Sequence, residues 1–341
     1  MKAGKTINQL IETVVSEGRN KRDFISDTRH VTMMASGGLE ILDIGGFALT
    51  NHAHSQIAQR VQIPQRYYDR MRQEAPELLS NNVNHWFQEN PEPRLIRTMN
   101  GKARAFLSNR YRVLDNYDLL QAIVPKLREV GCRPESMDIT ERKLYLKCLF
   151  PKIEMAVSVG DVVQAGLVIS NSEIGMGSLR IEPLIYRLVC ANGLIAPDAG
   201  LVKFHLGRAL GDDQDHAFEL YRKETIEATD KAFWMTVSDT IDALLTPEVF
   251  DRIVGRLRSA KDQHITDIPK TVELTRKQLN LTDDEQASVL HHLAEGGDLS
   301  LYGLTNAVTR TSQDLIDYDR ATEMERSAWS LLDLHYLPDH R

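Results

Sequence analysis

The spacing of hydrophobic and polar residues changes about two thirds of the way along the chain. Up to about residue 210, short runs of alternating apolar and polar residues are separated by Gly, Pro or Asn, a pattern typical of strands. After about residue 211 the apolar positions recur at helical spacing. The pattern predicts an α+β fold: an antiparallel, β-rich domain with flanking helices over residues 1–210, followed by an all-α domain over residues 211–341.

Helical segments interrupt the strands of the N-terminal half. Their apolar residues lie on one face, and prolines or N-capping residues mark several of their starts. The predicted helices are residues 1–18, 53–62, 64–73, 76–89 and 116–130.

Two strand-like runs in the middle of this half, residues 94–99 and 103–108, are joined by Asn100-Gly101. Asn-Gly between alternating residues favours a tight hairpin, because both residues tolerate positive φ. Further strands are predicted within residues 140–150, 152–160, 162–171, 178–190 and 201–207.

The segment SNSEIGMGSLRIEPLIYRLVCANGLI, residues 170–195, combines an apolar run with polar edges. We interpret its Gly and Asn residues as sheet corners, one at residues 175–178 and one at residues 191–193. The alternative is a ligand-facing role for Asn171, Arg187 and Asn192. The glycine pattern does not match a phosphate-binding loop.

Charge is distributed unevenly along the 341 residues, although the net charge is only −7. Residues 1–210 hold 27 Lys and Arg against 22 Asp and Glu, whereas residues 211–341 hold 14 against 26. This asymmetry suggests different partners for the two halves. Well-solvated acidic helices would produce the same asymmetry without any partner.

The strongest candidate site is the basic β-ribbon around the predicted hairpin. In a two-residue hairpin, cations two residues apart share a face, and aromatic residues among them could stack on bases. Such a ribbon is suited to single-stranded nucleic acid, although a solvated strand face with its rings in the core fits the pattern equally well. The predicted nucleic-acid-binding residues are Arg94, Arg97, Lys102, Arg104, Arg110, Tyr111 and Arg112.

Enzymatic chemistry is less well supported. Glu141 and Lys143, with Asp115 or Asp118 upstream, loosely match the carboxylate-and-lysine site of metal-dependent nucleases. The eleven histidines and three cysteines show no metal-binding spacing, and no Ser or Cys nucleophile motif is present. We therefore expect no catalytic residues, no metal site and no cofactor.

Four stretches of the chain together resemble one known family: residues 47–71, 103–120, 166–195 and 301–332. The resemblance is to the phage/plasmid-like protein family, an uncharacterised family carried by phages, prophages and conjugative elements. It implies a mobile-element setting in a bacterial cytoplasm and names no activity or catalytic residue. Because many genes in that setting handle single-stranded DNA, it favours the nucleic-acid interpretation by association.

These observations predict a cytoplasmic, non-enzymatic protein of a phage or mobile element that binds single-stranded DNA, in annealing or recombination. The acidic helical half would contact host or phage proteins, and no membrane partner is expected because no apolar run is long enough. The sequence does not decide whether the protein forms homo-oligomers. The alternatives are a metal-dependent nuclease around Glu141 and Lys143 and a protein-binding inhibitor of host defence.

Overall fold

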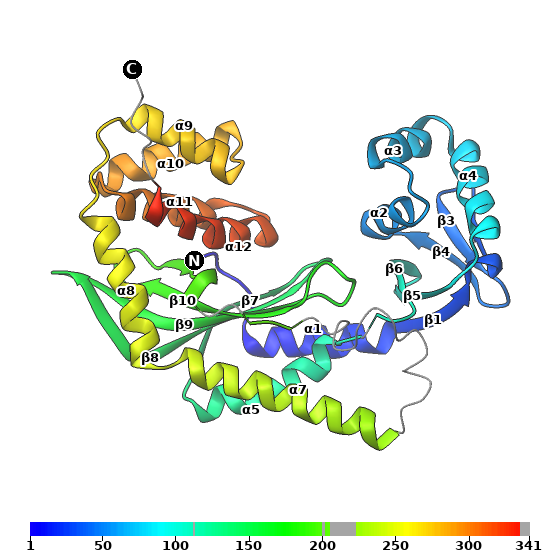
Figure 1. Ribbon diagram of the computed structural model, residues 1–341, viewed down its shortest axis with the longest axis horizontal. Helices are drawn as coiled ribbons and strands as arrows, with labels where there is room; N and C mark the ends of the chain where they lie inside the picture. The colour runs from blue at the N-terminus through cyan, green and yellow to red at the C-terminus, as the bar shows by residue number, and fades with distance from the viewer. Residues whose placement is uncertain (112, 200–201, 205–222, 335–341) are drawn as a thin grey trace.

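The protein is described by a computed structural model that covers residues 1–111, 113–199, 202–204 and 223–334. Within these residues the backbone forms two sheets in two lobes, with most of the helices packed around the second sheet (Figure 1). The predicted α+β class is confirmed. None of the helices in the described part combines the length and the apolar content that a membrane crossing requires.

The first sheet contains six strands, and all neighbouring strands are antiparallel except β4 and β6. In sheet order the strands are β1 (Lys21–Asp27), β5 (Pro93–Met99), β6 (Lys102–Ser108), β4 (Gly45–Leu49), β3 (Gly38–Ile41) and β2 (Val31–Met33). Three helices pack their apolar faces against this sheet: α2 (Asn51–Arg60), α3 (Gln65–Glu74) and α4 (Pro76–Glu89).

The Asn-Gly turn forms as the sequence predicts. Asn100 and Gly101 both have positive φ, at 52° and 74°, and they join β5 to β6. Positive φ at both central residues gives the turn the twist of the two flanking strands, which fixes the register of the ribbon.

The second sheet is antiparallel, with strand order β11-β10-β9-β8-β7 and β12 paired with β10. Its strands are β7 (Arg133–Ile139), β8 (Leu144–Ser158), β9 (Asp161–Asn171), β10 (Leu179–Arg187), β11 (Asn192–Ile195) and β12 (Val202–Phe204). Three features differ from the sequence prediction. The runs 140–150 and 152–160 contribute to one long strand, β7 was not anticipated, and Asn192 and Gly193 begin a strand rather than form a turn.

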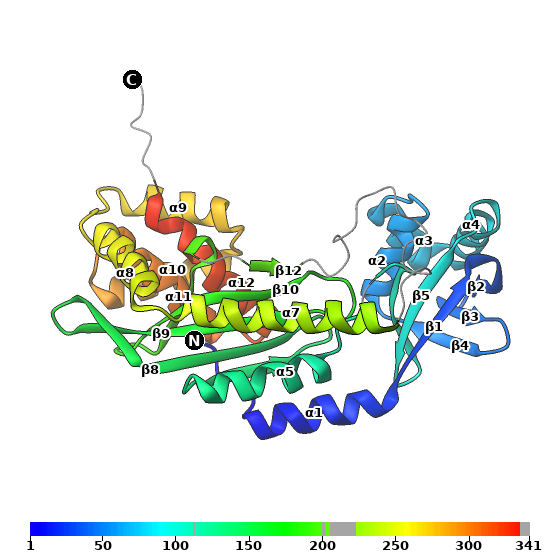
Figure 2. The same cartoon turned by 60° about the horizontal axis from the view of Figure 1, so that its bottom comes forward.

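Helices cover both faces of the second sheet (Figure 2). Even-numbered residues of β8, such as Leu144 and Leu146, share a core with α1 (Ile7–Asn20), α5 (Asn116–Glu129) and α7 (Lys223–Leu244). Because side chains alternate along a strand, odd-numbered residues of β8 face the opposite side. There Lys147 meets Glu325 of the C-terminal helices.

The C-terminal helices share a buried core with β9, β10 and β11. These helices are α8 (Pro247–Lys261), α9 (Ile268–Leu279), α10 (Asp283–Gly296), α11 (Leu301–Asp314) and α12 (Tyr318–Ser327), followed by the 3-10 turn η3 (Ala328–Asp333). Helix α9 was not anticipated from the sequence. The expected domain boundary at residue 210 lies within 205–222, outside the described residues, and that division stays a prediction.

Candidate nucleic-acid interface

Arginines of the basic ribbon make ion pairs within the protein. Arg97 on β5 is 4% exposed; its Nε lies 3.0 Å from Asp23 and its Nη2 lies 2.6 Å from Asp115. Its Nη1 donates to the carbonyl of Glu173 at 2.8 Å. Burial by itself would lower the pKa of Arg97, but the hydrogen bonds and charges of the two carboxylates raise it. These contacts indicate a structural role for Arg97.

The other cations of the ribbon differ in exposure. Arg94 pairs with Glu92 and lies over the Phe106 ring, while Arg104 donates to Glu173 at 3.3 Å. Lys102 and Arg110 are exposed. Arg112 lies outside the described residues.

Aromatic rings of the ribbon point into the protein. Phe106 is buried and stacks on Phe87, with ring centroids 5.4 Å apart. Tyr111 packs against Leu95 and Leu107, and its hydroxyl donates to the carbonyl of Ser172 at 3.1 Å. The Phe106 ring is buried and the Tyr111 ring is partly buried, so stacking by Tyr111 stays a prediction.

The polar segment after β9 joins the two sheets. The carboxylate of Glu173 is almost fully buried and accepts from Lys21 of β1, Arg104 of β6 and the backbone N–H of Asn116, the last at 2.8 Å. The carbonyl of Ile174 accepts from His52 and Gln56 of α2, at 2.8 and 2.9 Å. The turn interpretation therefore describes this loop correctly, and its additional role is to hold the lobes together.

The three residues considered as ligand-facing have partners inside the protein. Asn171 Nδ2 donates to the Leu114 carbonyl at 3.0 Å, and Arg187 forms a two-pronged pair with Asp161 at 2.7 and 2.9 Å. Asn192 Oδ1 accepts from Gln313 at 2.6 Å, which ties β11 to α11. Their polar groups serve packing, and a ligand-facing role has no support in this geometry.

The residues of the nuclease alternative are not brought to one cavity. Asp115 pairs with Arg97 and, together with Asp118, lines a cavity beside α1 and β1. Lys143 lines a different cavity, and exposed Glu141 lines neither of these two. Among the described residues, the carboxylates predicted for the nuclease alternative therefore do not gather around Lys143.

Three cations gather where β8 and β10 begin. Arg142 and Lys143 precede β8, and Arg180 lies two strands away on β10, across β9. Among the described residues, none of these three side chains has an acidic group within ion-pair distance. We call Arg142, Lys143 and Arg180 the cation cluster.

The cation cluster lines one end of a cavity of about 750 Å³ between the second sheet and the C-terminal helices. Tyr145, Met176 and Trp329 supply apolar surface to the same cavity. Burial lowers the pKa of Lys143, and the positive charges of Arg180 and Arg326 lower it further, whereas Asp319 and Glu182 oppose this shift. Because neighbouring cations repel each other, an anion at this end of the cavity would stabilise the group.

Sequence reasoning missed the cation cluster. Arg142 and Lys143 were seen only as part of a nuclease triplet, and Arg180 is 37 residues further along the chain. Only the strand order brings these residues together, because β9 lies between β8 and β10 and the first residues of β8 and β10 lie at the same end of the sheet. The sequence carries no local signal for the cluster, because Glu141 and Glu182 stand two residues from Lys143 and Arg180.

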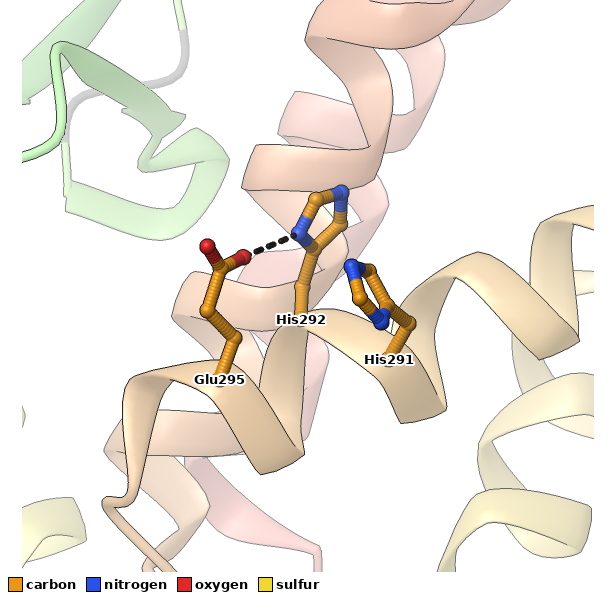
Figure 3. A group of neighbouring side chains, drawn as sticks. All are labelled: His291, His292 and Glu295. Carbon is orange, nitrogen blue, oxygen red and sulfur yellow. Dashed lines mark hydrogen bonds and ion pairs between the residues drawn. The ribbon is translucent and has the colours of Figure 1, made fainter.

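One group of side chains has donor atoms suited to a metal ion. His291, His292 and Glu295 lie on successive turns of α10, and their candidate ligand atoms are within 4.8 Å of one another (Figure 3). The prediction from the sequence considered only the spacing between histidines and so missed this group. Glu295 is four residues after His291 and therefore lies on the same helical face.

The chain was compared with protein families, curated proteins and solved structures, and one family matches part of it. No curated protein and no solved structure matches the chain. One protein family matches over residues 105–236, a stretch that includes the second sheet, the Glu173 loop and the cation cluster. Over these residues the chain is similar to the family described as a domain of unknown function, DUF932.

Proposed function

We propose that the protein binds single-stranded DNA without cutting it, and that the cation cluster contacts the phosphates. The observation that carries this proposal is the convergence of Arg142, Lys143 and Arg180 in one cavity, with no ion pair to any of the three among the described residues. Phosphate groups would neutralise charges that otherwise repel one another, and counterion release would add affinity. This site replaces most of the ribbon, where Arg94, Arg97 and Arg104 already pair with carboxylates.

Two hydrogen bonds connect the segment of the cation cluster to the end of the ribbon. The Tyr111 hydroxyl donates to the carbonyl of Ser172, and the Ser172 hydroxyl donates to the carbonyl of Arg142 at 3.0 Å. Arg110, adjacent to Tyr111, is exposed. A strand of DNA that leaves the cavity near Arg142 could therefore continue past Arg110.

The resemblance to phage/plasmid-like proteins supports a mobile-element setting, in which single strands arise during transfer and recombination. The acidic surface of the C-terminal helices would oppose loose binding of DNA elsewhere on that half, while Asp319 and Glu323 of α12 line the cavity beside the cation cluster. We expect no preference for a particular DNA sequence, because a site that contacts phosphates binds the sugar-phosphate backbone and does not read the bases.

The test is fluorescence anisotropy with a labelled oligothymidylate and the matching duplex, at about 0.05–0.2 M salt with EDTA. The variant carries Arg142→Ala, Lys143→Ala and Arg180→Ala. Loss of three single-strand phosphate contacts should reduce the slope of log K against log salt by about 2, at about 0.7 for each contact.

A matched control removes the same charge elsewhere, through Arg128→Ala, Lys152→Ala and Arg252→Ala, which are exposed cations outside the cavity. We expect this control to keep nearly the wild-type slope. The proposal is wrong if wild-type protein does not bind single strands at low salt, or if both triple variants bind alike. A repeat with Mg²⁺ in place of EDTA should leave the oligonucleotide intact, and cleavage would revive the nuclease alternative.

A further inference from the structure

The imidazole of His292 on α10 lies between two carboxylates. Its Nε2 is 2.8 Å from Asp314 Oδ2, at the end of α11, and its Nδ1 is 3.3 Å from Glu295 Oε2. A neutral imidazole has a single N–H and can donate to one acceptor only. The other nitrogen then presents a lone pair to a carboxylate, an arrangement that a metal ion bound by both groups would stabilise.

The surroundings of His292 favour a metal ion. The His291 ring lies beside it, with centroids 5.3 Å apart, and adds a second nitrogen donor (Figure 3). The side chain of His292 is only 9% exposed, whereas Glu295 is 67% exposed and free to adjust. Bonds of about 2.0–2.2 Å from one ion would reach all three ligand atoms after small side-chain rotations.

Asp314 contacts the side of the His292 ring that faces away from Glu295, so it could orient the imidazole without binding the metal ion itself. In the tautomer that donates from Nε2 to Asp314, the Nδ1 lone pair lies on the side of Glu295. A carboxylate that orients a metal-binding histidine in this way is common in zinc sites. Arg310, 3.6 Å from the other oxygen of Asp314, helps to keep that carboxylate in place.

We propose that His291, His292 and Glu295 bind one divalent transition-metal ion, and that Asp314 orients His292. Two imidazoles and one carboxylate form a ligand set that Zn²⁺ accepts, with the remaining position open to water. The site joins α10 to α11 and does not rest on the nucleic-acid proposal.

The experiment is a calorimetric titration of untagged, metal-free, full-length protein with Zn²⁺. We expect one ion per chain, and at least about tenfold weaker binding for His291→Gln and for Glu295→Gln. Asp314→Asn should weaken binding about 10–100-fold, as for other outer partners of zinc ligands. His85→Gln, which removes an exposed helical histidine far along the chain on α4, should bind like wild type.

Thermal unfolding gives a second readout that does not depend on heat of binding. Zn²⁺ should raise the Tm of wild type and of His85→Gln equally, and it should raise the Tm of Glu295→Gln clearly less at the same concentration. Stoichiometric uptake that survives both His291→Gln and Glu295→Gln would overturn the proposal, as would the absence of uptake by wild type.

Discussion

At the residue scale, the two glycines of the polar segment 170–195 have different roles. Gly175 has φ of +80°, and a Cβ added there would lie 2.6 Å from Leu107 Cδ2. Gly193, expected in a turn, lies in β11 with φ outside the left-handed region, and a Cβ there would meet only the Met1 side chain. Backbone strain is therefore expected at Gly175 and not at Gly193.

Gly175→Ala should destabilise the protein by about 1–3 kcal/mol, because the alanine is strained at positive φ and crowds Leu107. Urea unfolding measures the change. Gly255→Ala is the matched control, since Gly255 lies inside α8 with no atom within 4 Å of an added Cβ. That substitution should be neutral or stabilise the helix by up to about 1 kcal/mol. Equal costs at both positions would contradict the strain argument.

At the element scale, α10 begins with a capping box that is tied to a second helix. Thr282 and Glu285 hold each other's backbone N–H, and Arg320 of α12 donates to both oxygens of Glu285, at 2.9 and 2.8 Å. Hydrogen bonds from Arg320 lower the pKa of Glu285 below its usual 4.5. A depressed folded pKa means that the carboxylate stabilises the folded state above the unfolded value. This contribution is lost as the pH falls through the folded pKa.

Glu285→Gln should therefore cost about 1.5–3 kcal/mol at neutral pH and much less at a pH well below 4.5, where the wild-type carboxyl is protonated. Gln keeps the cap hydrogen bond, so the difference reports the charge. Urea unfolding of both proteins across this pH range gives the measurement. Glu248→Gln, in the exposed first turn of α8, should show little pH-dependent difference from wild type. A cost for Glu285→Gln that is independent of pH would refute the ion-pair explanation.

At the scale of the whole molecule, the second sheet and the C-terminal helices are joined by an ion pair without solvent contact. Lys147 Nζ on β8 lies 2.5 Å from Glu325 Oε2 on α12, and both side chains are 0% exposed. Burial lowers the pKa of Lys147, while the charge and hydrogen bond of Glu325 oppose this shift. Removal of one partner would leave a buried charge without compensation.

Lys147→Met should cost about 3–5 kcal/mol, whereas the double variant Lys147→Met with Glu325→Leu should be far closer to wild type. Chemical unfolding of the two single variants and the double variant gives the coupling free energy. The exposed pair Arg70–Glu74 is the control, because Arg70→Met should change stability by less than about 1 kcal/mol. Additive costs at Lys147 and Glu325 would show that the pair does not act as a unit.

Local elements followed from the sequence because their causes are local. The Asn-Gly hairpin depends on two residues that tolerate positive φ, and the start of α10 depends on a threonine and a glutamate three residues apart. The amphipathic period likewise predicted α1 and most later helices. The basic ribbon was correctly placed on β5 and β6, although its use as a nucleic-acid site stays a prediction.

Only the tertiary structure decided which charges are available to a ligand. Arg97 appeared accessible in the sequence, yet Asp23 and Glu173, 74 and 76 residues away, use its hydrogen bonds. Conversely, Arg180 is brought to Lys143 by strand pairing alone. The physical reason is that a charge is neutralised by the group that reaches within a few ångströms of it. A sequence reports residue types and local periods, while those distances are set by the packing of elements far apart in the chain.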